Sequence, residues 1–122
     1  MNIHKSAEDY LEMILMLQQE KGFARSVDIA ASLSVSKPSV SVAMKKLREN
    51  GYILMDADNL ITLTETGEAI ARRMYTRHTV LTQMLMRLGV SEETAREDAC
   101  KMEHDLSEET FAAIQRHLEM YQ

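Results

Sequence analysis

The sequence of 122 residues has only one cysteine and one proline, and it lacks long apolar runs. A single cysteine cannot form an internal disulfide bond, which excludes a disulfide-stapled secreted domain. Polar residues interrupt every apolar stretch well before the roughly 20 residues that a membrane-spanning helix needs. No amino-terminal segment has the pattern of a secretory signal. We therefore expect a cytoplasmic protein that does not enter a membrane. Its hydrophobic content of 45% is ordinary for a globular fold.

The net charge of −5 is divided unevenly along the chain. Residues 22–50 carry five basic and two acidic side chains, which is a local charge of +3. Residues 91–122 carry three basic and nine acidic side chains, which is a local charge of −6. The first segment suits the phosphates of a nucleic acid, and the second suits a cation.

Helical periodicity of apolar residues predicts six helices, and the expected N-caps are Ser6, Thr64, Ser91 and Ser107. The third helix is expected to begin at Ser36, with Pro38 in its first turn. The expected helices span residues 6–21, 26–33, 36–50, 65–88, 92–104 and 108–120. Residues 52–56 and 60–63 predict two short strands of a β-hairpin, because turn-forming residues separate them.

This order of elements is typical of a winged helix-turn-helix. The predicted fold is mainly α with a small β-hairpin wing: a DNA-binding domain over residues 1–63, then a helical domain over residues 64–122. The long helix 65–88 links the two. In this fold the third helix enters the major groove of DNA and the hairpin touches the backbone.

Short polar and basic side chains gather in and near the third helix, and such groups suit phosphates and base edges. Any one of them is equally well a solvated surface residue, so the inference rests on their joint placement. The expected DNA-binding residues are Arg25, Ser36, Lys37, Ser39, Val40, Ser41, Lys45 and Lys46.

Two helical faces carry possible metal ligands. Asp9 and Glu12 stand three residues apart, and Cys100, Glu103 and His104 follow one another at i, i+3 and i+4. Asp9 and Glu12 alone are simply explained as first-turn carboxylates favoured by the helix dipole. Burying a thiol, a carboxylate and an imidazole together would be costly without a partner, and a divalent cation would supply one.

His78, in the long helix, could add an imidazole from a third direction. A lone histidine is more often a hydrogen-bonded structural residue, and a lone cysteine is more often a small buried hydrophobe. Sulfur and nitrogen donors together favour transition metals over calcium or magnesium.

Several stretches resemble the diphtheria toxin repressor and manganese transport regulator family of metal-dependent repressors, in its short form without an SH3-like domain. The resemblance covers essentially the whole chain, and its strongest parts are residues 6–12, 28–30, 63–67, 77–78 and 98–107. It implies metal ligands at Asp9, Glu12, His78, Cys100, Glu103 and His104, and it implies that the helical domain over residues 64–122 binds metal and dimerises.

Cys100 departs from the manganese-type pattern, which usually has glutamate there, and matches the iron-type pattern. The positions that match the iron-type ancillary site hold Thr82 and Arg96, so we expect that site to be absent. The resemblance implies Fe2+ or Mn2+ as corepressor, with Co2+ and Zn2+ as possible surrogates. The thiolate inclines the prediction narrowly to iron.

The expected function is a homodimeric repressor, not an enzyme, that binds a palindromic operator in double-stranded DNA when metal is present and controls genes of metal homeostasis. No small-molecule substrate is expected. In the expected mechanism the metal ties the first helix to the fourth and fifth helices. The expected dimer interface consists of Met84, Leu85, Leu88, Phe111, Ile114 and Leu118. The alternative for some of these residues is that they fill the core of the monomer.

Two other functions fit parts of the sequence. One is a metal-independent winged-helix regulator in which Cys100 senses oxidants. The other is a small metal-dependent hydrolase with Asp105 or Glu108 as its base, although the sequence has no substrate-pocket or nucleophile motif.

Overall fold

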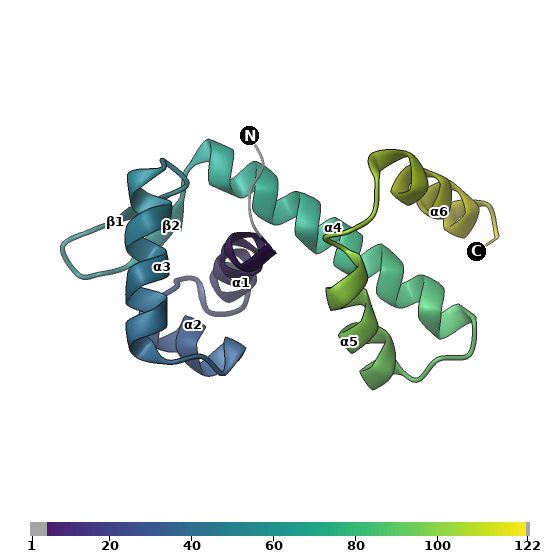
Figure 1. The fold of residues 1–122 in the computed structure, drawn as a ribbon, viewed down its shortest axis with the longest axis horizontal. Coiled ribbons are helices and arrows are strands. Elements are labelled where there is room, and N and C mark those ends of the chain that lie inside the picture. Colours follow the sequence, from purple (N-terminus) through teal and green to yellow (C-terminus); the bar gives the residue numbers. More distant parts are fainter. Residues whose placement is uncertain (1–4, 122) are drawn as a thin grey trace. The chain divides into compact units, whose positions relative to one another are not determined.

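A computed structural model describes residues 5–121, which form six helices and a two-stranded hairpin (Figure 1). The elements are α1 (Lys5–Lys21), α2 (Ser26–Leu33), α3 (Lys37–Glu49), β1 (Ile53–Met55), β2 (Ile61–Leu63), α4 (Glu65–Arg87), α5 (Glu92–Met102) and α6 (Glu108–Met120). The chain divides into two compact units after Arg72, inside α4. The predicted fold class, mainly α with a small hairpin wing, is confirmed.

Unit 1, up to Arg72, is built from α1, α2, α3, the hairpin and the start of α4. In the hairpin β1 pairs with β2 in antiparallel register, with Ile53 opposite Leu63. Ile61 also donates its backbone N–H to the carbonyl of Ala24, so the hairpin is anchored to the segment between α1 and α2. The core consists of Leu11, Ile14, Leu15, Leu17, Ala24, Ile29, Ala30, Val40, Met44, Leu47, Tyr52, Ile53, Ile61 and Ala71.

Serine caps start three of the helices where the sequence places them. The hydroxyls of Ser36, Ser91 and Ser107 accept hydrogen bonds from backbone N–H groups three residues later, at 3.2, 3.4 and 3.1 Å. Pro38 lies in the first turn of α3, where its missing N–H costs nothing. Local side-chain chemistry therefore sets these helix boundaries.

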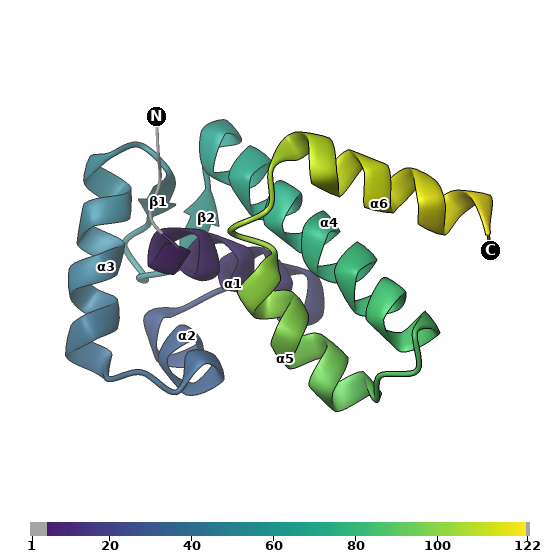
Figure 2. The ribbon, with the colours of Figure 1, turned by 45° about the vertical axis from the view of Figure 1, so that its right-hand side comes forward.

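Unit 2 combines the rest of α4 with α5 and α6, which flank α4 in both Figure 1 and Figure 2. Its buried apolar residues include Met74, Leu81, Ala99, Phe111 and Leu118. Phe111 and Leu118, two residues of the expected dimer interface, are buried within the single chain, which agrees with the alternative that some of those residues fill the monomer core. None of the helices that the structure describes combines the length and the apolar character needed to cross a bilayer.

Gly67 lets the first turn of α4 approach the backbone at Tyr52. A Cβ at this position would overlap the carbonyl oxygen of Tyr52. The same carbonyl accepts a hydrogen bond from the N–H of Thr64 at 3.0 Å. The hydroxyl of Thr64 in turn donates to the carbonyl of Gly51 at 2.7 Å, which fixes the helix start on the chain before β1.

We predict that Gly67→Ala destabilises the protein, because the backbone must move to relieve the overlap. The expected loss in free energy of unfolding is about 1–3 kcal/mol. Urea denaturation in chelator measures it without a contribution from bound metal. Thr66→Ala, at an exposed neighbouring position, is the control and should change stability by no more than about 0.5 kcal/mol. Equal stability of both variants would contradict the close approach.

Candidate metal centre and nucleic-acid interface

The carboxylate of Glu103 is fully buried in unit 2 and is positioned by the end of α5. Its backbone N–H donates to the carbonyl of Ala99 at 2.9 Å, which continues the last turn of the helix. His78 reaches it from α4, with Nδ1 3.0 Å from Oε2. His104 lies on its other side, with Nε2 3.5 Å from Oε1. The structure thus brings three of the predicted ligands together within one unit.

The second carboxylate oxygen, Glu103 Oε1, has no hydrogen-bond partner within residues 5–121. Its 3.5 Å separation from His104 is too long for a good hydrogen bond. A buried, incompletely paired carboxylate is costly, and a cation offsets that cost. One carboxylate between two imidazoles is a donor set that transition metals bind well, so these residues fit a metal ion.

Cys100 lies one helical turn before Glu103 on α5, and its side chain is exposed. The sequence predicts that the side chains of Cys100, Glu103 and His104 are buried together. This prediction is wrong for Cys100, but Glu103 is fully buried and the side chain of His104 is only 3% exposed. Exposure leaves Cys100 accessible both to a metal and to oxidants.

Asp9 and Glu12 lie in α1, in unit 1, three residues apart. Because α1 already includes Lys5, neither residue belongs to its first turn, where Glu8 is the acidic residue. The helix dipole acts mainly within the first turn and so does not explain them. Glu12 is buried and Asp9 is half-buried.

Glu108, one of the two bases considered for a hydrolase, accepts contacts from two arginines. Arg77 Nη2 lies 2.8 Å and Arg73 Nη2 lies 3.0 Å from the same Oε1 atom. The second base, Asp105, is exposed in the turn after α5.

Seven of the eight residues expected to bind DNA are exposed, and they lie on α3 or near it in the sequence. Arg25, Ser36, Lys37, Ser39, Ser41, Lys45 and Lys46 are all exposed. Val40 is the exception: its side chain is fully buried in the core of unit 1 and cannot reach a ligand. The apolar residue that α3 presents to solvent is Val42, which is 56% exposed. Sequence reasoning did not single out Val42, although its position off the apolar stripe of Val40, Met44 and Leu47 was a usable signal.

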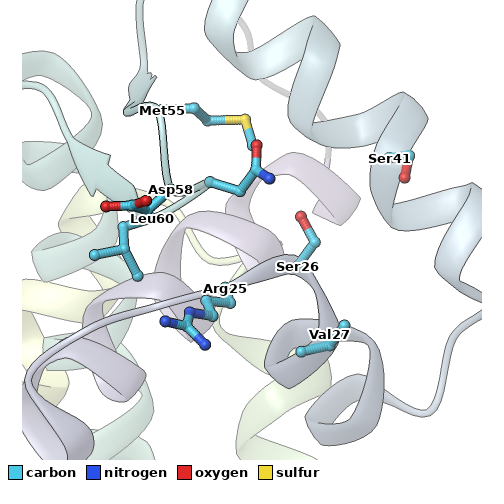
Figure 3. A pocket seen from close by; sticks show the side chains of 8 residues that line it. Arg25, Ser26, Val27, Ser41, Met55, Asp58 and Leu60 are labelled. Carbon is cyan, nitrogen blue, oxygen red and sulfur yellow. The ribbon is translucent and has the colours of Figure 1, made fainter.

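A hollow of about 700 Å³ lies within unit 1 between the helix-turn-helix and the hairpin wing (Figure 3). Figure 3 shows residues from the start of α2, from α3 and from the wing around it. Its lining consists of Arg25, Ser26, Val27, Ser41, Met55, Asp58, Asn59 and Leu60. Arg25 and Ser41 were expected to bind DNA, whereas the wing residues were not named.

The wing turn itself is rigidly built. The Asp56 carboxylate accepts hydrogen bonds from the backbone N–H groups of Asp58 and Leu60, both at 2.9 Å. Asn59 adopts a positive φ of 61°, which asparagine tolerates well. The wing tip is acidic and exposed, so it is poorly suited to close contact with phosphates.

Comparison with known proteins assigns both halves of the chain. The family described as "Iron dependent repressor, N-terminal DNA binding domain" matches residues 2–59. The family described as "Iron dependent repressor, metal binding and dimerisation domain" matches residues 64–122. Together these two matches cover nearly the whole chain.

Individual proteins similar to this chain are transcriptional regulators, in agreement with the two family matches. The transcriptional regulator MntR of Escherichia coli O157:H7 is 45% identical over 107 residues, which are 88% of this chain and 69% of that protein. The regulator MntR of Bacillus subtilis is 41% identical over 102 residues, covering 84% of this chain and 72% of that protein.

Solved structures of related regulators share the fold but are longer. The manganese regulator SloR aligns over 98% of this chain with a TM-score of 0.82 and 30% identity. A manganese-dependent transcriptional repressor in complex with manganese aligns over 95% with a TM-score of 0.84 and 30% identity. This chain spans only 55% and 54% of those two chains. The protein therefore belongs to the iron-dependent repressor family of metal-dependent transcriptional regulators, and the MntR proteins are among its relatives.

Proposed function

We propose that this protein is a homodimeric repressor whose affinity for a palindromic operator depends on a bound divalent metal ion. The observation that carries the proposal is the buried Glu103 carboxylate, with His78 and His104 beside it and one oxygen lacking a hydrogen-bond partner among the described residues. An exposed basic helix, α3, in the other unit supplies the means to bind DNA.

His78, Glu103 and His104 would hold the ion from unit 2, together with Cys100 from the preceding turn of α5. Asp9 and Glu12 would contribute carboxylates from α1, since they share one face of that helix and lie beyond its first turn. The ion, when bound, supplies positive charge that compensates these carboxylates and a fixed set of bonds between their helices.

In this proposal residues 1–63 bind DNA and residues 64–122 bind metal and dimerise. Ligands drawn from both parts restrict the motion of α3 relative to the dimer axis. A two-fold dimer must place its two recognition helices in successive major grooves, about 34 Å apart. Restricting that motion raises affinity for a palindromic site without any catalysis, which is why we propose a regulator and not an enzyme. We also propose that it acts in the cytoplasm, where a regulator of this kind would meet its DNA.

The choice between manganese and iron depends on Cys100. The relatives compared above include proteins named as manganese regulators. A thiolate at position 100 is a softer donor than the glutamate that the resemblance implies for manganese-type members, and it favours Fe2+, Co2+ or Zn2+. We propose Fe2+ or Mn2+ as the physiological ion, inclining to Fe2+, with Co2+ and Zn2+ as probes.

The direct test is an anaerobic binding titration on promoter-derived palindromic duplexes at fixed salt, with chelator, Mn2+, Fe2+, Co2+ or Zn2+. We expect at least one metal to raise DNA affinity by about 5- to 150-fold, the usual range of allosteric coupling. A response to peroxide with equal binding in every metal condition would instead identify a metal-independent regulator that uses the exposed Cys100.

We predict that Cys100→Glu shifts metal preference towards Mn2+, because a hard carboxylate replaces a soft thiolate. The ratio of Mn2+ to Zn2+ affinity should rise by about tenfold, measured by competition titration. Cys100→Ser is the matched control, since it removes the sulfur without adding a carboxylate and should weaken both metals. Unchanged selectivity in the Cys100→Glu variant would exclude Cys100 as a ligand.

We predict that Lys45→Ala weakens operator binding and lowers the slope of log affinity against log salt by about 1, because one phosphate contact is lost. Lys45 is exposed on α3. Lys101→Ala, at an exposed position on α5, is the control and should leave the salt slope unchanged. Similar effects of the two substitutions would show that binding follows overall charge and not contact by α3.

A further inference from the structure

Arg77 is a buried charged side chain that the proposed function does not use. It is 1% exposed and directly precedes His78 on α4. Burying a guanidinium group is costly unless its donors are paired, so its contacts identify what the fold gains from it.

The guanidinium group of Arg77 joins α4 to the chain that runs from α5 into α6. Nη1 donates to the backbone carbonyls of Glu103 at 2.9 Å and Leu106 at 2.8 Å. Nη2 donates to the carboxylate of Glu108, in the first turn of α6, at 2.8 Å. One planar group therefore fixes three successive points of the turn between the two helices.

Glu103 is thus held by two consecutive residues of α4. Arg77 binds its backbone carbonyl, and His78 contacts its side-chain Oε2 at 3.0 Å. A side chain attached at one end only would keep rotational freedom. Attachment of both the backbone and the carboxylate limits where Oε1 can lie, and a metal site requires that kind of preorganisation.

We propose that Arg77 is a positioning residue of the metal centre: it fixes the backbone at Glu103 so that the Glu103 carboxylate is presented to the ion. The inference rests on the proposed metal-dependent function. Arg77 donates through N–H groups only and does not bind the metal.

The surroundings of Arg77 suit a fixed group. Its guanidinium carbon lies 5.1 Å from the centre of the Phe111 ring, an arrangement that favours a planar cation. Glu108 compensates its charge, which limits the repulsion that a nearby metal cation would meet. Lysine would keep the charge but cannot place donors on two carbonyls and a carboxylate in one plane.

The test is Co2+ titration of the full-length chain under anaerobic conditions, followed by the visible absorption bands of bound Co2+. Arg77→Lys should bind Co2+ about 10- to 100-fold more weakly, the range seen when groups that orient metal ligands are changed. The shape of the Co2+ bands should also change, because the geometry of Glu103 at the metal changes.

Two controls separate positioning from loss of charge or of stability. Arg73→Ala removes the other, half-exposed arginine from Glu108 and should bind Co2+ within about twofold of wild type. Leu118→Ala removes buried volume from unit 2 and should lower the melting temperature while keeping the wild-type Co2+ bands. Neither residue makes a described hydrogen bond to Glu103.

Wild-type affinity and bands in Arg77→Lys would overturn the inference. If Arg77→Lys does not fold, Glu108→Gln decides: it replaces the charged acceptor that holds Nη2, so it should loosen the guanidinium group, weaken Co2+ binding severalfold and change the shape of the Co2+ bands. Wild-type bands in that variant would likewise count against the inference. A wild-type chain that binds no Co2+ would contradict the proposed function itself.

Discussion

The buried carboxylate of Glu103 is the group around which the contacts of unit 2 are arranged. Removing an ionised carboxylate from water costs several kcal/mol unless its oxygens are paired. Oε2 lies 3.0 Å from Nδ1 of His78, whereas Oε1 has no hydrogen-bond partner among the described residues. The fold accepts this cost beside a second imidazole, that of His104, as is expected where a cation completes the pairing.

The second buried charge, Arg77, is paired with different groups. Two backbone carbonyls and Glu108 accept hydrogen bonds from its Nη atoms, while its Nε has no hydrogen-bond partner among the described residues, so Arg77 does not neutralise the Glu103 carboxylate. If Arg77 paired directly with that carboxylate, the site would have little affinity for a metal. The turn between α5 and α6 therefore keeps the two opposite charges apart while it uses one to position the other.

Much of this arrangement follows from local sequence. Serine caps and helical periodicity predict the helices to within a few residues, and the ligand spacing at Cys100, Glu103 and His104 predicts one helical face. The prediction for Val40 was wrong because a residue on the apolar stripe with Met44 and Leu47 was also assigned to the DNA-binding face. One side chain cannot both pack in the core and contact DNA.

Other features carry no sequence signal. Arg77 acts mainly on backbone carbonyls, which every residue has, so its partners cannot be identified from residue types. The exposure of Cys100 likewise depends on how α5 packs and not on its neighbours in the chain. Pairwise contacts between elements must be seen in three dimensions before either residue can be understood.

Thermodynamic reciprocity offers the most direct test of metal-dependent repression. If metal raises operator affinity by some factor, saturating operator must raise metal affinity by the same factor. We predict that metal titrations of the wild-type protein, with and without operator duplex, differ by the factor found in the DNA titrations. The same metal affinity with and without DNA would contradict the account, because the metal site and the DNA-binding surface would then be independent.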